Sequence, residues 1–538
     1  MTRRFILSLP ILVAGIAAGP AACQGTNTQS PKLVVFITVD AMRSDYLSRF
    51  APQLTGGLGR LYNGGAVFTN GFQDHAITET APGHSVIMSG RYPVHTGISA
   101  NTAGVNDTTV SLIDATGLGA SPFRFRGTTL TDWLIAKDPR TRILSVSRKD
   151  RAAILPIGRS KQPVFWYGSN GNFTTSSYYA ASLPEWVRAF NARKMPATYA
   201  GKAWQLLLPA SAYSEPDSVP IESNGINFTF PHVESSSPDT ATLLLGEFPW
   251  MDELTLDFAM TGINALSLGK GPQTDLLSIS LSTTDAIGHR YGPDSREVHD
   301  QILRLDRALG VFLDSLYRIR NPGDVVVALT ADHGLTPFPE AHAHDANAGA
   351  IRVNPRPVLQ QLSNSLAAAG VPGYGLSFIA GVYTGNGFSF DGGVLDLDRA
   401  ALSKARVNRD SLVRSVRAAF LKVPGVARAD RISELAQRDT VNDRIGRRWL
   451  HMFSNEDKAA LVVTLAPFNY WLSGWIAQHG SPNDIDAHVP IIFYGSGVKP
   501  GRYGEFAGVV DMAPTLASIV HVTPLEKLDG HVLQNAIR

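Results

Sequence analysis

The sequence has very little cysteine and no marked excess of charge. Its 538 residues include one cysteine, Cys23, so no intrachain disulfide framework can form and stability must come from a hydrophobic core and bound metal. The 48 Lys and Arg residues nearly balance the 46 Asp and Glu residues, leaving a formal net charge of +2. No dense basic run with interleaved aromatic residues occurs. These features argue against nucleic acid as a specific partner.

The N-terminal stretch lacks the length of a membrane span. Arg3 and Arg4 precede an apolar run at 5–18, which is broken by glycine and proline and followed by small residues. This layout predicts a secretory signal peptide over residues 1–23. Ala21 and Ala22 before Cys23 are similar to a bacterial lipoprotein acylation site, although Pro20 departs from that pattern. We therefore expect an exported protein that is periplasmic, secreted or an outer-membrane lipoprotein, with Cys23 as the candidate lipid anchor.

Three short apolar runs indicate buried parallel strands, and each ends at a carboxylate. The runs cover 32–40, 275–285 and 324–334. Between the last two, apolar residues recur at helical spacing from 298 to 316, with Asp294 or Ser295 as candidate cap. A strand–helix–strand unit places both strand ends at one edge of a sheet, where open α/β folds carry their sites. The sequence therefore predicts an α/β fold with a mostly parallel central sheet flanked by helices.

The chain divides by composition into a signal, a discontinuous core and two excursions. Residues 136–250 are rich in Ser, Asn, Tyr and Trp with little long periodicity, and we expect them to form an inserted cap carrying Lys149 and Arg151. Residues 342–475 form a second excursion, with a basic helix-like piece at 402–421. The core is expected in three parts, at 31–135 with the candidate nucleophile, 251–341 and 476–538.

The stretch 78–101, "TETAPGHSVIMSGRYPVHTGISAN", places a hydroxyl at a predicted helix start. Pro82 is compatible with the first turn of a helix, so Thr80 would lie where unpaired backbone N–H groups attract anions. Taken alone, Thr80 is better explained as a helix cap. We interpret His84, one turn further on, as a buried structural histidine.

Acids and histidines lie at or near the ends of the predicted strands. Asp285 and His289 are one helical turn apart, Asp332 and His333 are adjacent, Asp40 ends the first run, and His488 precedes an apolar run. Each is explained alone by a structural role. Together they offer the oxygen and imidazole ligands that suit Zn²⁺, and two such ions can clamp an in-line phosphoryl displacement.

With these motifs the chain resembles the alkaline phosphatase superfamily. The resemblance is to the branch that contains nucleotide pyrophosphatases/phosphodiesterases and the PafA-like and PhoK-like bacterial alkaline phosphatases. It rests on motifs in the order of that family: "VVFITVD", "TETAPGHSVIMSGRYPVHTGISAN", "LSVSRKDRAAILPIG", "STTDAIGHRYGPDS", "TADHG", "DAHVPIIFYG" and "DMAPTLA".

The resemblance implies two Zn²⁺ ions and a threonine nucleophile. One ion would be held by Asp285, His289 and His488. The other would be held by Asp40, Asp332 and His333, with the Thr80 oxygen as a further ligand. Asn101 matches a residue that donates to a phosphoryl oxygen.

Lys149 and Arg151 bear on the choice between monoester and diester substrates. In an extended segment they share one face, with Arg148 and Asp150 pointing away, and two cations neutralise the extra charge of a monoester. By resemblance, Ser147, Lys149 and Arg151 match the Ser-x-Lys-x-Arg motif of PafA-like enzymes. We therefore expect a zinc-dependent alkaline phosphatase acting on small phosphate monoesters through a phosphothreonine intermediate. The alternatives are a phosphodiesterase or nucleotide pyrophosphatase on the same metals and, more remotely, a non-catalytic envelope binding protein.

Overall fold

The computed structural model describes residues 30–342, 349–453, 458–474 and 476–538. The predicted signal peptide and Cys23 lie outside the described residues, so export and lipid anchoring stay predictions. Within the described residues, no helix combines the length and apolar character needed to cross a membrane.

A large mixed sheet forms the centre of the molecule. Its nine described strands run in the order β19-β2-β18-β9-β1-β8-β3-β4-β5. The five strands from β9 to β4 are mutually parallel, which confirms the predicted mostly parallel sheet. β18 runs antiparallel to both of its neighbours, and β5 is antiparallel to β4. The bounds are β1 Leu33–Val39, β2 Ala66–Phe72, β3 Ile143–Ser147, β4 Val164–Tyr167, β5 Phe173–Thr174, β8 Asp275–Leu281, β9 Val325–Thr330, β18 Ile491–Gly495 and β19 Gly501–Gly508.

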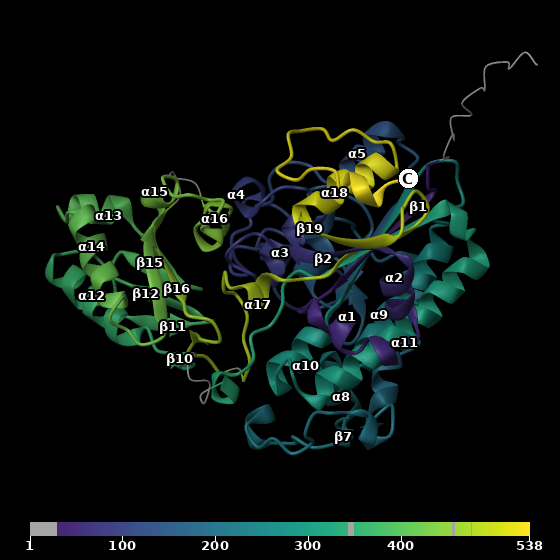
Figure 1. The fold of residues 1–538 in the computed structure, drawn as a ribbon, viewed down its shortest axis with the longest axis horizontal. Helices are drawn as coiled ribbons and strands as arrows, with labels where there is room; N and C mark the ends of the chain where they lie inside the picture. Colours follow the sequence, from purple (N-terminus) through teal and green to yellow (C-terminus); the bar gives the residue numbers. More distant parts are fainter. Residues whose placement is uncertain (1–29, 343–348, 454–457, 475) are drawn as a thin grey trace, which may run out of the picture.

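Helices cover the sheet, and the longest is the one predicted from its periodicity. This helix, α11, spans Arg296–Ile319, and the Ser295 side chain accepts a hydrogen bond from the N–H of Val298 at its start. Figure 1 shows α11 beside α2 and α9 at one end of the molecule. The other helices of the core are α1 Asp45–Arg49, α2 Gly57–Gly64, α3 Thr80–Ile87, α4 Pro93–Thr96, α5 Leu130–Lys137, α6 Asp150–Ile154, α9 Trp250–Ala265, α10 Thr283–Tyr291, α17 Asp484–Ala487 and α18 Met512–Ile519.

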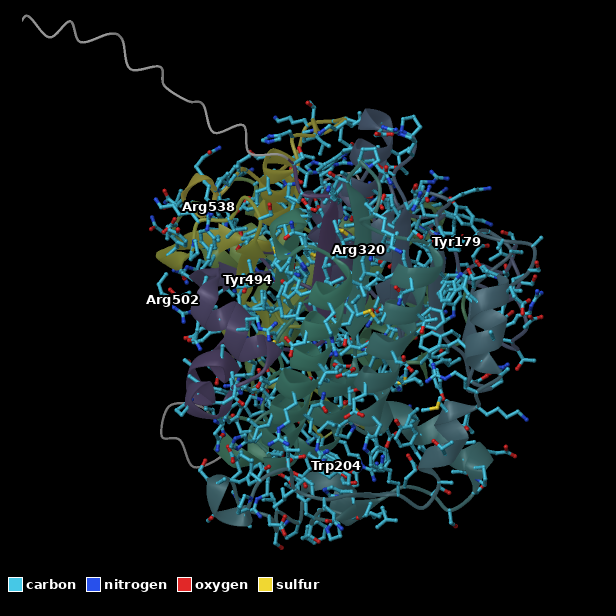
Figure 2. The ribbon with its side chains drawn as sticks, turned by 90° about the vertical axis from the view of Figure 1, so that its right-hand side faces the viewer. Tyr179, Trp204, Arg320, Tyr494, Arg502 and Arg538 are labelled. Carbon is cyan, nitrogen blue, oxygen red and sulfur yellow. The ribbon has the colours of Figure 1, made fainter. Side chains whose placement is uncertain are left out.

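The prediction that residues 136–250 stand outside the core is wrong for their first part. β3, β4 and β5 extend the central sheet beyond β8. These strands are short, which left little periodicity to detect. The remainder does form a covering layer over one side of the core, with Trp204 at its lower end in Figure 2. Its elements are α7 Glu185–Asn191, β6 Ala203–Trp204, β7 His232–Val233, α8 Pro238–Leu244 and short 3₁₀ turns that include Glu222–Gly225 and Leu245–Glu247.

The second excursion is more regular than the sequence indicated. Its described residues form a six-stranded antiparallel sheet, in the order β11-β12-β13-β14-β16-β15, packed with helices around a separate hydrophobic core. Figure 1 shows this second domain in green, beside the main sheet. Its elements are α12 Arg356–Ala368, β11 Ser377–Ile379, β12 Val382–Gly385, β13 Phe388–Asp391, β14 Val394–Leu397, α13 Arg399–Lys404, α14 Arg409–Phe420, β15 Val426–Arg431, α15 Ile432–Leu435, α16 Arg444–Leu450 and β16 Ala459–Leu465; a small pair, β10 Arg352–Val353 and β17 Tyr470–Trp471, lies near it.

The second domain packs against the segment that leads to the candidate nucleophile. Ala76 and Ile77 share a hydrophobic cluster with Val394 and Trp449 of the second domain. Arg447 of α16 also pairs with buried Asp74, with its Nε atom 2.8 Å from the carboxylate. These contacts join the second domain to the chain just before α3.

Candidate active site

The predicted acids meet at one edge of the central sheet. β1 lies between β8 and β9, with Val39 paired to Leu281 and Thr38 to Thr330. Asp40 directly follows β1. It therefore lies beside the segment that follows β8 and enters α10, which carries Asp285, and beside the turn that follows β9, which carries Asp332 and His333. All four side chains are buried or nearly so. The prediction that the strands ending near Asp285 and Asp332 share one sheet edge is confirmed, and Asp40 lies at the same edge.

Two groups of side chains place their donor atoms close enough to share a metal ion. Asp285, His289 and His479 form one, and Asp40, Asp285 and His333 form the other; within each, the donor atoms lie within 4.8 Å of one another. Asp332 adjoins the second group, because its Oδ2 atom lies 3.6 Å from Nε2 of His333.

Several donor atoms of these groups are buried without a hydrogen-bond partner among the described residues. They are Asp40 Oδ1, Asp285 Oδ1, Asp332 Oδ2 and His333 Nε2. Buried polar atoms are normally paired, and unpaired ones point to a ligand that would satisfy them. Oxygen and imidazole donors with these burials fit divalent metal ions of the zinc type.

The three histidines are oriented alike by backbone carbonyls. The Nδ1 atoms of His289, His333 and His479 lie 2.8 Å from the carbonyl oxygens of Ala477, Gly334 and Thr78 respectively. A carbonyl only accepts, so each Nδ1 carries a proton, and Nε2 is the ring nitrogen left to bind a metal ion beside the acids. Such an outer hydrogen bond is the usual partner of a metal-binding imidazole.

His488 does not belong to this site, and the prediction that it completes one ligand group is wrong. Its Nε2 atom lies 3.0 Å from the carbonyl oxygen of Thr69, and its ring stacks on Phe72 with centroids 4.8 Å apart. His479 takes the expected place, with Nε2 3.6 Å from Asp285 Oδ1 and its ring stacked on His333. His479 lies in a polar loop without periodicity, and the sequence carried no signal that separated it from His488.

Thr80 begins α3, as the Thr-Ala-Pro pattern predicted, and it is 1% exposed. Glu79 is the residue before the helix, so Thr80 is not itself the cap. Gly83 lets the helix approach the strand ends: a Cβ atom there would lie 2.2 Å from the carbonyl oxygen of Asp332. His84 has the structural role we expected, with Nδ1 2.9 Å from the Thr80 carbonyl and Nε2 2.9 Å from Ser280 Oγ.

Lys149 connects the nucleophile to both ligand groups. Its Nζ atom lies 2.6 Å from Asp40 Oδ2, 2.7 Å from Asp285 Oδ2 and 3.3 Å from Thr80 Oγ1. Lys149 directly precedes α6, so the segment turns into a helix, and the predicted extension through Arg151 is wrong. Arg148, Lys149, Asp150 and Arg151 all line the same cleft, so the predicted alternation of faces is wrong although both predicted cations reach the site.

The pKa values of the candidate ligands shift in different directions, because burial and the neighbouring charges act on each group to a different extent. Burial, followed by the charge of Asp332, raises the pKa of Asp40 to about 6. Burial also opposes ionisation of Asp285, but Lys149 and His289 together hold its pKa well below the usual range. Burial would lower the pKa of His333, yet the neighbouring carboxylates, Asp332 first, raise it. The Lys149 ammonium group offsets part of the negative charge of Asp40, Asp285 and Asp332, and a bound divalent cation would offset more of it.

Asn101 is fixed beside the nucleophile by a residue that the sequence analysis missed. The backbone N–H of Asn101 donates to Glu79 Oε2 at 2.7 Å, and its Oδ1 accepts from the N–H of Ala81 at 2.9 Å. Removal from water, followed by the charge of Asp391, raises the pKa of Glu79 to about 7. With Oδ1 engaged, the amide NH₂ group of Asn101 is the part that can donate to a substrate.

A cleft of 1210 Å³ opens onto this site. Thr80, Asn101, Lys149, Arg151, Asp285, His289 and His479 all line it. Asp40, Asp332 and His333 lie beneath its floor, at 0% exposure. The candidate nucleophile and three cationic or amide side chains, those of Asn101, Lys149 and Arg151, are therefore accessible from the open side of the cleft.

Comparison with known proteins agrees with this architecture. The model of the type I phosphodiesterase/nucleotide pyrophosphatase family matches residues 34–353. The chain is 30% identical to alkaline phosphatase PhoV of Synechococcus elongatus over 535 residues, covering 94% of this chain and 93% of that protein. It is 31% identical to alkaline phosphatase PhoK of a Sphingomonas species over 524 residues, covering 94% and 91%.

A solved structure extends the similarity to three dimensions. The crystal structure of alkaline phosphatase PafA superimposes with a TM-score of 0.83 at 28% identity, covering 95% of this chain and 99% of that one. The chain belongs to the type I phosphodiesterase/nucleotide pyrophosphatase family and has the PafA-type alkaline phosphatase fold. It is a phosphoric ester hydrolase.

Proposed function

We propose that this protein is a zinc-dependent alkaline phosphatase that hydrolyses phosphate monoesters through a phosphothreonine intermediate on Thr80. The observation that carries the proposal is the position of Lys149, whose Nζ atom lies 3.3 Å from Thr80 Oγ1, with Arg151 on the same cleft wall. The names and whole-length similarity of PhoV, PhoK and PafA support phosphatase activity.

Asp285, His289 and His479 would hold one zinc ion, and Asp40, Asp332 and His333 the other, with Thr80 Oγ1 as a further ligand. Bound there, divalent zinc would supply Lewis-acid stabilisation of negative charge on the reacting oxygens. The two groups share the space around Asp285, which agrees with a pair of neighbouring ions.

The residues of the chain would act in sequence around the phosphorus atom. Thr80 Oγ attacks phosphorus as its hydroxyl proton passes to solvent, the bond from phosphorus to the ester oxygen breaks, and that oxygen takes a proton from solvent and leaves as the alcohol. Water then attacks the phosphothreonine, which releases inorganic phosphate and restores the Thr80 hydroxyl. Asn101, Lys149 and Arg151 hold the non-reacting oxygens through both steps, where donors aimed at developing charge have their largest effect.

The chief alternative is a phosphodiesterase or nucleotide pyrophosphatase, because the matching family model carries that description. A monoester dianion carries one more negative charge than a diester, and Lys149 and Arg151 offer two cations for it. A non-catalytic envelope binding protein is disfavoured by the intact nucleophile and donor groups. We also propose export to the cell envelope or beyond, on the basis of the predicted signal at residues 1–23.

The deciding experiment compares p-nitrophenyl phosphate with bis-p-nitrophenyl phosphate on protein stripped with a chelator and reloaded with Zn²⁺. We expect kcat/KM for the monoester to exceed that for the diester by at least about tenfold. We expect the stripped protein to be inactive and metal analysis to give two zinc ions per chain. A clear preference for the diester would establish the alternative, and absence of turnover on both esters in zinc-loaded protein would favour the binding protein.

A further inference from the structure

Large apolar side chains that remain exposed gather at the active-site cleft. Leu118, Ile226, Leu243 and Leu244 are between 36% and 69% exposed, and all four line the cleft. Single exposed aliphatic residues are ordinary on protein surfaces, but several around one concave site mark a binding surface. We call these four residues the apolar rim.

The apolar rim is held in place over the helix that carries two of the candidate metal ligands. Arg290 of α10 directly follows His289; its Nε donates to Ser223 Oγ at 2.8 Å and its Nη1 to Glu247 Oε2 at 2.5 Å. These bonds tie the turn before Ile226 and the turn after Leu244 to α10. On the other side, Tyr167 of β4 donates from its hydroxyl to the carbonyl of Thr242, next to Leu243, at 2.8 Å.

The position of the apolar rim determines which part of a substrate it meets. The phosphoryl group belongs at the floor of the cleft, near Thr80 and Lys149, which are 1% and 10% exposed. The remainder of a monoester is its alcohol, which must extend from the floor toward the open side. At 1210 Å³ the cleft is much larger than a phosphoryl group, and small-ligand pockets are typically about 300–1000 Å³.

The chemistry of the rim distinguishes between classes of alcohol. Its side chains are aliphatic, and Leu112 and Trp166 add apolar surface to the same cleft. The charges of Arg290 and Glu247 are already paired with each other, so they offer little to a sugar or a nucleobase. The guanidinium group of Arg148 packs against the backbone of Gly246, so closely that a Cβ atom added to Gly246 would lie 2.1 Å from Arg148 Nε. Apolar surface leaving water on this lining favours an apolar alcohol.

We propose that the preferred substrates are phosphate monoesters of apolar alcohols, with a chain of about six carbons or more lying on the apolar rim. This inference rests on the proposed monoesterase function and adds the substrate class. Because unbranched primary alcohols are similar leaving groups whatever their length, a series of their phosphates isolates the contribution of the rim.

The experiment measures release of inorganic phosphate from ethyl, butyl, hexyl and octyl phosphate below their aggregation concentrations, with zinc-loaded protein. Each methylene that is partly buried raises kcat/KM by about twofold, so we expect octyl phosphate to exceed ethyl phosphate by at least about tenfold. Equal values across the series, or a higher kcat/KM for adenosine 5′-monophosphate than for octyl phosphate, would overturn the proposal. Inactivity toward all of these esters and p-nitrophenyl phosphate would instead defeat the monoesterase function on which it rests.

Two variants locate the effect. Ile226→Asn and Leu243→Asn should each lower kcat/KM for octyl phosphate by about threefold or more and leave ethyl phosphate and inhibition by inorganic phosphate unchanged. Leu525→Asn is the matched control, because Leu525 is 55% exposed and does not line the cleft. Equal losses for ethyl and octyl phosphate in the rim variants, or a similar loss in the control, would contradict a role in holding the alcohol.

Discussion

The Nζ atom of Lys149 lies 2.6 Å from Oδ2 of Asp40, at the floor of the active-site cleft. Lys149 follows β3, whereas Asp40 follows β1, and β8 separates these two strands in the sheet. The contact therefore crosses the edge of the sheet at which the candidate metal ligands lie. In the structure the Lys149 ammonium group offsets the charge of the crowded carboxylates, and it stands within reach of Thr80 Oγ1. This position is the reason we propose that Lys149 also contacts the phosphate of the substrate.

Replacing Lys149 and Arg151 together by Ala should lower kcat/KM for p-nitrophenyl phosphate by about 100-fold or more. The loss for the bis-p-nitrophenyl diester should be less than about tenfold, because the two cations match the extra negative charge that only the monoester carries. Steady-state kinetics on both esters provides the measurement. Lys161→Ala is the control, since Lys161 is exposed and contacts the ring of Tyr178. Equal losses on the two esters would contradict the assigned role.

Thr80→Ala should reduce turnover of monoesters by at least about 1000-fold, because it removes the attacking oxygen, while Thr80→Ser should retain part of the activity. Quenching the wild type during turnover should yield a phosphorylated peptide that contains Thr80, detected by mass spectrometry and missing from Thr80→Ala. Thr116→Ala, an exposed threonine on the same cleft, serves as the control. Normal turnover by Thr80→Ala would refute nucleophilic catalysis by this residue.

Opposite effects on metal content and activity are expected when His479 and His488 are replaced by Ala. His479→Ala should lose about one bound zinc per chain and most of the activity, because its Nε2 faces Asp285. His488→Ala should keep its metal content and change kcat/KM by less than about threefold, since it removes only a contact to Thr69 and Phe72. Elemental analysis with kinetics on both variants decides the matter. Loss of zinc from His488→Ala alone would reverse the assignment.

Glu79 should act as a positioning residue for Asn101. Glu79→Ala removes the acceptor of the Asn101 backbone N–H and should lower kcat/KM for monoesters by about 10- to 100-fold, with weaker inhibition by inorganic phosphate. Glu79→Gln keeps an acceptor oxygen and should recover most of that loss. Glu185→Ala, at an 80% exposed side chain, is the control. The idea fails if the Ala and Gln variants lose activity equally.

Buried Glu222 should make the free energy of unfolding fall as the pH rises. It is 3% exposed, and burial, followed by the charge of Glu297, raises its pKa to about 9 from an ordinary 4.5. Between these values the folded state holds a proton that the unfolded state has released, so this group lowers the free energy of unfolding as pH rises. Glu222→Gln should therefore raise Tm by about 2–4 °C at pH 8 and by much less at pH 5. Thermal unfolding at both pH values, with Glu185→Gln as control, tests this; an equal gain at both would contradict it.

Much of the site could be predicted from the sequence because it follows the strands. Parallel strands end at a common edge, so Asp40, Asp285 and Asp332 had to lie close together once their strands shared a sheet. Helical periodicity likewise predicted α11, and Pro82 predicted the start of α3. These features depend on local pattern and on rules of chain connection.

What the sequence determined by itself was the α/β core, the helix start at Thr80 and the acids at the strand ends. Tertiary structure alone decided that His479 and not His488 faces Asp285, that Glu79 holds Asn101, and that β3 to β5 join the main sheet. The reason is physical: a loop residue such as His479 gains its partners from segments distant in the chain, and nothing in its own neighbourhood encodes which carbonyl orients it.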